Sequence, residues 1–224
     1  NDSYQKGDNF VWYPHEEVIR FVSKYIKKRI DINKFWINTS EKKILDFGCG
    51  IGRHVFFLDD MELEPWGIDI SAVAINKAKE WAAALNKMHL AGRMMIVNGK
   101  PPLPFTDKFF TFVVSHGVFD SMPFTVAREN IIDIARIMKE DGLFYLDLVS
   151  GDDDRHFREY EAEEVVVTEH EKGTIQSYFN FHKILNLISG SGFIIQEATL
   201  IKRENILNKG INSRYHLILK RVSL

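Results

Sequence analysis

A glycine-rich turn between a short apolar run and a helical segment constrains this chain more than any other feature. The run Lys43–Phe47 carries Asp46 near its end, and Gly48, Gly50 and Gly52 then occupy every second position. Three residues without a Cβ let backbone N–H groups come close to a nucleotide-like ligand. The stretch therefore predicts a buried strand, a tight turn and a helix, with the ligand held at the turn.

A second acidic residue, one strand further along the chain, supports a ligand that contains adenosine. The next strand candidate spans Leu63–Asp69, and Asp69 follows Asp46 at about the 20-residue separation at which a second-strand acid binds ribose hydroxyls. We expect adenosine at the carboxyl ends of these two strands. The glycine spacing is G-x-G-x-G, whereas nicotinamide dinucleotide sites use G-x-G-x-x-G, so a nicotinamide oxidoreductase is less favoured.

The same residues, together with motifs further along the chain, resemble the class I S-adenosylmethionine-dependent methyltransferases. The resemblance covers roughly residues 40 to 150 and, more loosely, the C-terminal end. The matching stretches are Ile44–His54, Gly67–Ser71, Leu103–Phe105, Phe109–Ser115 and Ala135–Phe144. It implies an enzyme with an α/β fold: a Rossmann-like seven-stranded sheet in the order 3-2-1-4-5-7-6, with strand 7 antiparallel and helices on both faces.

The resemblance also implies how S-adenosylmethionine, and the product S-adenosylhomocysteine, would be held. The backbone of the glycine turn would take the methionine part of the cofactor, and Asp46 would approach its amino group. Phe119 stands where relatives pack a side chain near the methionine or adenosine part, and Cys49 is interpreted as a small turn residue. The predicted cofactor-binding residues are Asp46, Gly48, Cys49, Gly50, Gly52, Asp69, Ile70, Asn98, Gly99, Ser115 and Phe119.

Two positions depart from the family pattern. Relatives often carry an aspartate at Gly99, where it accepts a hydrogen bond from the adenine amino group; here Asn98, shifted by one residue, or backbone groups would have to replace it. Strand 4 of the family commonly carries an aspartate where this chain has Thr111. These departures keep open a non-catalytic domain that binds the cofactor or a partner.

The segment that follows strand 4 supplies the predicted catalytic residues, Asp120 and His116. It lies next to the point where open α/β sheets bind ligands, and many small-molecule relatives carry a histidine at the position of Asp120. The alternatives are a loop histidine bonded to the backbone and an aspartate that caps the next turn. For a hydroxyl acceptor the candidate bases, in order of preference, are Asp120, His116, Asp147 and His170. An amine acceptor could react as its free base.

Two segments outside the core motifs are predicted to shape the substrate pocket. Helical spacing of apolar residues over His15–Ile30 predicts a helix, and the resemblance implies that residues 1–40 form a helical lid over the cofactor. Residues 150–176 are predicted to insert a hairpin near the active site. The predicted substrate-binding residues are Trp12, Tyr13, His170 and Tyr178. The alternatives are simple packing of the N-terminal aromatic residues, and an insertion that is solvated or contacts a second copy.

Composition limits the remaining possibilities. The length of 224 residues predicts a single domain over 1–224, and a net charge of −2 argues against nucleic acid as a partner. The single cysteine fits a reducing compartment, so we expect a cytoplasmic protein. No apolar run reaches the length of a membrane span, and no metal site is predicted. We expect a monomer or homodimer.

These features predict methyl transfer to a small molecule. The acceptors we favour are a sugar or nucleotide-sugar, a natural-product intermediate, or a small amine or acid. The chain lacks the Asn/Asp-Pro-Pro-Tyr/Phe signature with which relatives that methylate bases continue after strand 4. A protein or RNA methyltransferase that docks through Arg20–Lys43 is the alternative within the same class.

Overall fold

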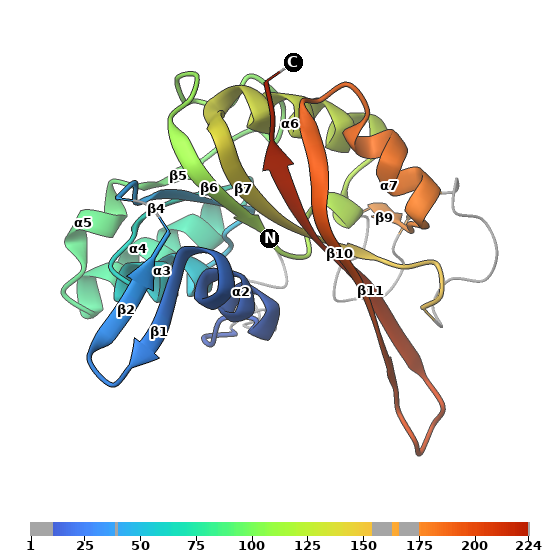
Figure 1. The fold of residues 1–224 in the computed structure, drawn as a ribbon, viewed down its shortest axis with the longest axis horizontal. Helices are drawn as coiled ribbons and strands as arrows, with labels where there is room; N and C mark the ends of the chain where they lie inside the picture. Colours follow the sequence, from blue (N-terminus) through green and yellow to red (C-terminus); the bar gives the residue numbers. More distant parts are fainter. Residues whose placement is uncertain (1–10, 39, 154–162, 166–174, 224) are drawn as a thin grey trace. The chain divides into compact units, whose positions relative to one another are not determined.

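The computed structural model describes residues 11–38, 40–153, 163–165 and 175–223 (Figure 1). These residues fall into two compact units. The first comprises residues 1–99 and 110–114, and the second comprises 100–109 and 115–224. Each unit is described separately below.

Seven strands form one mixed sheet in the order β10-β11-β7-β6-β3-β4-β5. Strand β3 pairs in parallel with β4 and β6, β4 pairs in parallel with β5, and β11 is antiparallel to both β7 and β10. This order confirms the predicted sheet, including its antiparallel last strand. The strands are β3 Lys43–Phe47, β4 Glu64–Asp69, β5 Met94–Ile96, β6 Phe110–Ser115, β7 Met138–Val149, β10 Phe193–Glu204 and β11 Ile211–Arg221.

In the first unit, helices α3 Arg53–Asp60, α4 Ala72–Ala84 and α5 Met88–Ala91 accompany the parallel strands. Ser71 caps α4, because its hydroxyl accepts a hydrogen bond from Ala74 N at 3.2 Å. The core between these elements consists of Cys49, Val55, Phe56, Ile75, Ala78, Ala82, Leu90 and Met94. Val55 and Phe56 of α3 belong to this core, so the packing of the core fixes the position of α3, which begins directly after the glycine turn.

The N-terminal segment departs from the predicted helix over His15–Ile30. Helix α2 spans Glu16–Phe21, a π-helical turn covers Val22–Ile26, and the antiparallel strands β1 Lys27–Asp31 and β2 Lys34–Ile37 follow. The apolar spacing is therefore helical only as far as the π-helical turn. Beyond it, Ile and aromatic residues on either side of a short polar turn favour a hairpin. Residues 11–38, the described part of the segment predicted as a helical lid, are thus part helix and part hairpin.

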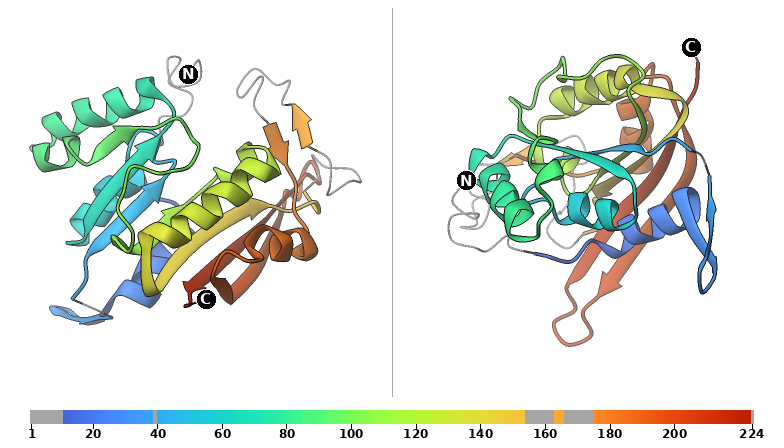
Figure 2. Two further views of the ribbon diagram at one scale, coloured as in Figure 1. Left: turned by 90° about the horizontal axis from the view of Figure 1, so that it is seen from above. Right: turned by 90° about the vertical axis from the view of Figure 1, so that its left-hand side faces the viewer.

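In the second unit, helices α6 Phe124–Ile137 and α7 Phe181–Ile188 pack against each other, and α6 packs on β7 (Figure 2). Helix α7 begins after Asn180, because the Asn180 side chain accepts a hydrogen bond from Lys183 N at 2.8 Å and caps the helix there. Strands β8 Glu163–Val165 and β9 Ile175–Ser177 form an antiparallel pair within the predicted insertion.

In the parts of the chain that the structure describes, no helix is long and apolar enough to cross a membrane. The same residues contain no group of three or more histidine, cysteine or acidic side chains arranged to hold a metal ion.

Candidate active site

The glycine turn has the backbone geometry that its sequence predicts. Gly48, Gly50 and Gly52 all have positive φ, at 79°, 53° and 87°, a region that side chains with a Cβ rarely adopt. Gly48 N donates to Ile68 O at 2.8 Å, which ties the turn to β4. A Cβ at Gly52 would lie 3.1 Å from the ring of Phe56. Both conformation and space therefore require glycine here.

Asp69 holds the turn and the start of α4 together. Its Oδ2 accepts from Gly50 N and its Oδ1 accepts from Ser71 N, both at 2.8 Å. Burial raises the pKa of this carboxyl above its ordinary value, although the two backbone N–H groups act in the opposite direction. A carboxylate at the end of β4 is suited to accept hydrogen bonds from ribose hydroxyls.

Asp46 is buried without the partners that a buried carboxylate normally has. Its side chain is 1% exposed, and neither oxygen has a hydrogen-bond partner among the described residues. The nearest basic group is His54 Nδ1, at 3.7 Å from Oδ1, while His54 Nε2 accepts from His15 N at 3.3 Å. An ammonium group would satisfy this carboxylate, so the residue fits the amino group of the methionine part.

The predicted adenine region explains one departure from the family pattern. Gly99 has a φ of 74°, and a Cβ there would lie 3.0 Å from Ile70 Cγ2. An aspartate at this position would therefore be strained and crowded. Ile70 is 69% exposed beside the carboxylate of Asp69, and Asn98 is also exposed. An apolar face next to a ribose-binding acid is suited to an adenine ring.

The other departure, Thr111, has a buried hydroxyl with no hydrogen-bond partner among the described residues.

Both N-terminal aromatic residues are exposed, but Trp12, at 40%, also contacts two other rings. The Trp12 ring stacks on Phe56 at 5.3 Å and meets the edge of Trp81 at 5.1 Å, whereas Tyr13 is 79% exposed. The contacts of Trp12 are those that the packing alternative predicts. Substrate binding by either residue stays a prediction.

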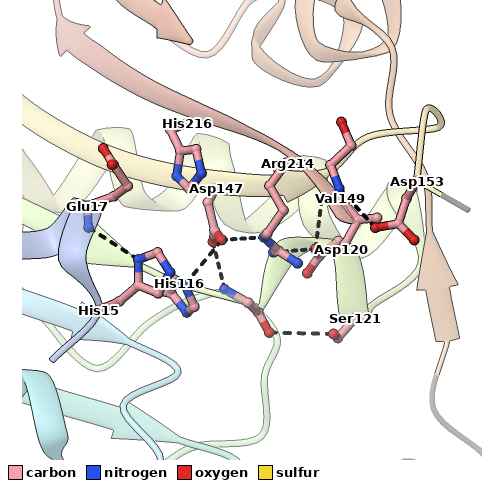
Figure 3. A network of polar contacts seen from close by, with 12 residues as sticks. His15, Glu17, His116, Asp120, Ser121, Asp147, Val149, Asp153, Arg214 and His216 are labelled. Atoms are coloured by element: carbon pink, nitrogen blue, oxygen red, sulfur yellow. Dashed lines mark hydrogen bonds and ion pairs between the residues drawn. The ribbon is translucent and has the colours of Figure 1, made fainter. Parts of the chain in front are cut away.

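In the second unit, a buried arginine joins two of the predicted acids (Figure 3). Arg214, on β11, donates from Nε to Asp147 Oδ2 at 2.7 Å and from Nη2 to Asp120 Oδ2 at 2.6 Å. The side chains of Asp147 and Asp120 are 0% and 2% exposed. The two acids raise the pKa of the arginine despite its burial, so the guanidinium stays charged. Sequence reasoning missed this arginine.

The network continues from Asp147 to His116, which follows directly after β6. His116 Nε2 lies 3.5 Å from Asp147 Oδ2, and Gly117 N donates to Asp147 Oδ1 at 2.7 Å (Figure 3). Burial alone would raise the pKa of Asp147, but Arg214 and His116 outweigh it and hold that pKa well below its ordinary value. Asp147 is therefore ionised next to an imidazole, an arrangement that stabilises imidazolium.

Asp120, the first candidate base, is more enclosed. Its Oδ2 also accepts from Val149 N at 2.9 Å, and its backbone carbonyl accepts from Gln176 Nε2 at 3.0 Å. Burial raises the pKa of Asp120, with Arg214 opposing that rise. Asp120 lies inside the short helix Phe119–Ser121, and the next helix, α6, has Pro123 at its N-cap and no side-chain cap, so the capping alternative is not observed. The structure thus brings Asp120 and His116 together only through Asp147 and Arg214.

The remaining predicted residues of this unit are mostly buried. Ser115 and Phe119 are fully buried, and the Phe119 ring meets the edge of Phe144 at 6.0 Å. Tyr178 is 4% exposed, and its carbonyl accepts from Lys183 Nζ at 3.0 Å. His170 lies outside the described residues.

The loop at Leu103–Phe105, one of the matching motifs, is held by Arg136 on α6. Its guanidinium donates to Leu103 O at 3.2 Å and Phe105 O at 2.9 Å, and it pairs with Asp133, which in turn accepts from Leu103 N at 2.6 Å. Both the loop carbonyls and the carboxylate depend on one side chain.

We expect Arg136→Ala to lower the free energy of unfolding by about 1–3 kcal/mol, because it strands several hydrogen-bonding groups. Urea denaturation measures the change. The matched control is Arg128→Ala on the same helix, where the side chain is exposed and donates to two carbonyls at 3.1 and 3.2 Å. Equal losses in the two variants would contradict the anchoring role of Arg136.

Comparison with known families fits this geometry. A family model described as a methyltransferase domain matches residues 38–187, more than half of the chain. The chain belongs to this methyltransferase family. It is an S-adenosylmethionine-dependent methyltransferase. The glycine turn, Asp46 and Asp69 of the first unit fit that cofactor. No curated protein matches the sequence.

Solved structures share the fold at low sequence identity. An S-adenosylmethionine-dependent methyltransferase from Methanosarcina mazei has a TM-score of 0.70 and 20% identity, over 83% of this chain and 95% of that one. The 1,6-didemethyltoxoflavin N1-methyltransferase of Burkholderia thailandensis, crystallised with 1,6-didemethyltoxoflavin and S-adenosylhomocysteine, has a TM-score of 0.65 and 11% identity, over 99% and 85%. The cyclase SpnF has a TM-score of 0.61 and 15% identity, over 82% and 76%. At these identities only the fold is shared.

Proposed function

We propose that this methyltransferase acts on a small molecule whose acceptor atom loses a proton on methylation. The observation that carries the proposal is the contact between His116 and the buried, ionised Asp147, directly after β6. Ligands of open α/β sheets bind outside the carboxyl ends of the strands, and β6 pairs with β3, which leads into the glycine turn. A histidine supported by a carboxylate at that place is suited to general-base catalysis.

When bound, S-adenosylmethionine supplies an electrophilic methyl group, so the chain has to position the acceptor and take its proton. Alignment of two bound reactants can supply roughly 7–11 kcal/mol of the barrier. His116 is the group that accepts the proton. Trp12, Tyr13, Tyr178 and His170 stay the proposed substrate-binding residues, and the hairpin over 150–176 stays the proposed insertion near the active site. The toxoflavin-precursor enzyme, a structural neighbour, acts on a small heterocycle, which supports this class of acceptor.

Two experiments test the proposal in sequence. Calorimetry with S-adenosylmethionine and S-adenosylhomocysteine, with NADH as control, measures cofactor binding. The enzyme is then incubated with panels of hydroxylated, amine and carboxylate small molecules, and S-adenosylhomocysteine release is followed. Turnover of a hydroxyl or heterocyclic N–H acceptor, lost in His116→Gln with unchanged cofactor affinity, is the expected result. Turnover that is insensitive to His116→Gln would reject the base.

A second candidate, methylation of RNA or protein, is favoured by one observation. On β1 and β2 the cations Lys28, Arg29 and Lys34 are exposed beside Phe35 and Trp36, which are 37% and 44% exposed. Basic and aromatic side chains together are typical of nucleic-acid contacts. RNA binding that weakens steeply with salt, and disappears in a variant with glutamines at the three cations, would favour this candidate.

A further inference from the structure

Arg214 is the member of the second unit's network that the sequence did not predict. It is also not one of the predicted cofactor-binding residues. It lies on β11 opposite Val149, the last residue of β7. Its side chain is 19% exposed, and its two hydrogen bonds, at 2.6 and 2.7 Å, go to two different carboxylates. A buried arginine with two acids is costly to assemble unless all its charges are satisfied.

While Asp120 and Asp147 are both ionised, the charges of the cluster do not cancel without a proton on His116. One guanidinium then stands against two carboxylates, which leaves a net negative charge among nearly buried groups, and this state is opposed by the burial that raises the pKa of Asp120. The neutral imidazole of His116, 3.5 Å from Asp147, would bring this charge to zero on protonation. The cluster is therefore built to favour the protonated product of a base. His216, whose Nδ1 lies 2.9 Å from Tyr145 Oη, is the other titratable side chain on β11 near Asp147.

We propose that Arg214 is a positioning residue for methyl transfer: it fixes Asp147 so that this carboxylate orients His116 and stabilises its imidazolium, while Asp120 anchors the other side of the guanidinium. This inference rests on the proposed function, in which His116 is the base. It assigns Asp120 a positioning role instead of the catalytic role that the sequence suggested.

The proton balance of the step follows from this arrangement. As the acceptor atom bonds to the methyl carbon, the carbon–sulfur bond breaks, its electron pair stays on sulfur, and the acceptor's proton goes to His116. The positive charge of the sulfonium is thereby replaced by the positive charge of the imidazolium. Asp147, ionised and held by Arg214, faces that charge as it forms.

The test is an NMR titration of the His116 ring in the wild-type chain and three variants. In Asp147→Asn the loss of a negative charge should lower the titration midpoint by about one pH unit. In Arg214→Met the carboxylate of Asp147 loses the group that holds it, so the midpoint should also fall, although the loss of a positive charge alone would raise it. Arg214→Lys keeps the charge and should return the midpoint toward that of the wild type, with at most one of the two ion pairs. A rise in Arg214→Met would show that Arg214 acts on His116 through its charge alone.

Arg221→Met is the matched control, because Arg221 lies on the same strand and donates to Ala135 O and Gly192 O, at 2.9 and 3.2 Å. It should lower stability and leave the His116 midpoint unchanged. Midpoints that do not move in either variant, or a midpoint that rises in Arg214→Met, would overturn the inference. S-adenosylhomocysteine affinity should be unchanged in Arg214→Lys.

Turnover separates this inference from the proposed function. With an acceptor that the wild type methylates, Arg214→Lys should lower kcat at least about tenfold, with a smaller change in KM. A wild type that binds the cofactor but methylates no small molecule would reject the proposed function, while the titrations would still decide whether Arg214 and Asp147 control His116.

Discussion

Asp46→Asn should make the cofactor-free protein more stable and at the same time weaken its binding of S-adenosylmethionine. The wild-type carboxylate is buried with no hydrogen-bond partner among the described residues, and its nearest basic atom, His54 Nδ1, is 3.7 Å away. A buried charge without partners costs more than a buried amide of the same shape. We expect the free energy of unfolding to rise by about 1–3 kcal/mol.

The same substitution removes the group that fits the cofactor's ammonium. We expect the dissociation constant for S-adenosylmethionine to rise by about ten- to hundredfold, the usual effect of losing a hydrogen bond between charged groups. Urea denaturation without cofactor and calorimetry with it measure the two effects on the same preparation. Their opposite signs would identify Asp46 as a residue kept for binding at the expense of stability.

The matched control is Asp133→Asn. Asp133 is also a buried carboxylate, but its oxygens accept from Leu103 N and pair with Arg136. This variant should lose stability and keep its cofactor affinity. If Asp46→Asn instead destabilises the cofactor-free protein as Asp133→Asn does, then the carboxylate is satisfied in the absence of ligand and the interpretation of Asp46 is wrong.

The backbone geometry of the glycine turn could be predicted from the sequence because its signals are local. A strand, the glycines of the turn and the acid that ends the next strand lie within a short stretch. The positive φ of Gly48, Gly50 and Gly52 follows from that spacing. The conformation of Gly99 was not predictable in the same way. From the sequence alone, the lack of an aspartate at Gly99 indicates a weakened adenine site. The structure shows instead that a φ of 74° disfavours any side chain at this position.

The Arg214 network could not be predicted, because it depends on register between distant strands. Pairing of β11 with β7 places Arg214 opposite Val149, and only this register brings its guanidinium to Asp147 and Asp120. A charged residue inside a strand of alternating pattern was the only signal in the sequence.

The prediction of a helix over His15–Ile30 was wrong for a different reason. Helical spacing holds up to Ile26, after which strand propensity and a turn take over.

Binding of S-adenosylhomocysteine should weaken as the pH is lowered, through protonation of Asp69. Ribose hydroxyls donate to the ionised carboxylate, and burial raises the pKa of Asp69 in the cofactor-free protein. Affinity should therefore be constant above that pKa and fall as the pH drops through it. Calorimetry between about pH 8 and about pH 3.5 covers the ordinary pKa of an aspartate carboxyl and the range above it.

The raised pKa of Asp69 also affects the stability of the cofactor-free protein, and its pH dependence is opposite to that of ligand affinity. Because the folded protein binds this proton more readily than the unfolded chain, the contribution of Asp69 to the free energy of unfolding decreases as the pH rises from the ordinary pKa to the raised one. The acid is therefore kept ionised at some cost to stability, although its oxygens hold Gly50 N and Ser71 N at 2.8 Å.

Two variants separate Asp69 from other groups that titrate, including those of the ligand. Asp69→Ala should weaken S-adenosylhomocysteine binding by about 1–3 kcal/mol, because it also strands the two backbone N–H groups. Asp69→Asn should bind more weakly than the wild type at neutral pH and lose most of the pH dependence. An equally steep fall in affinity in Asp69→Asn would place the titrating group elsewhere, and unchanged affinity in Asp69→Ala would remove the ribose assignment.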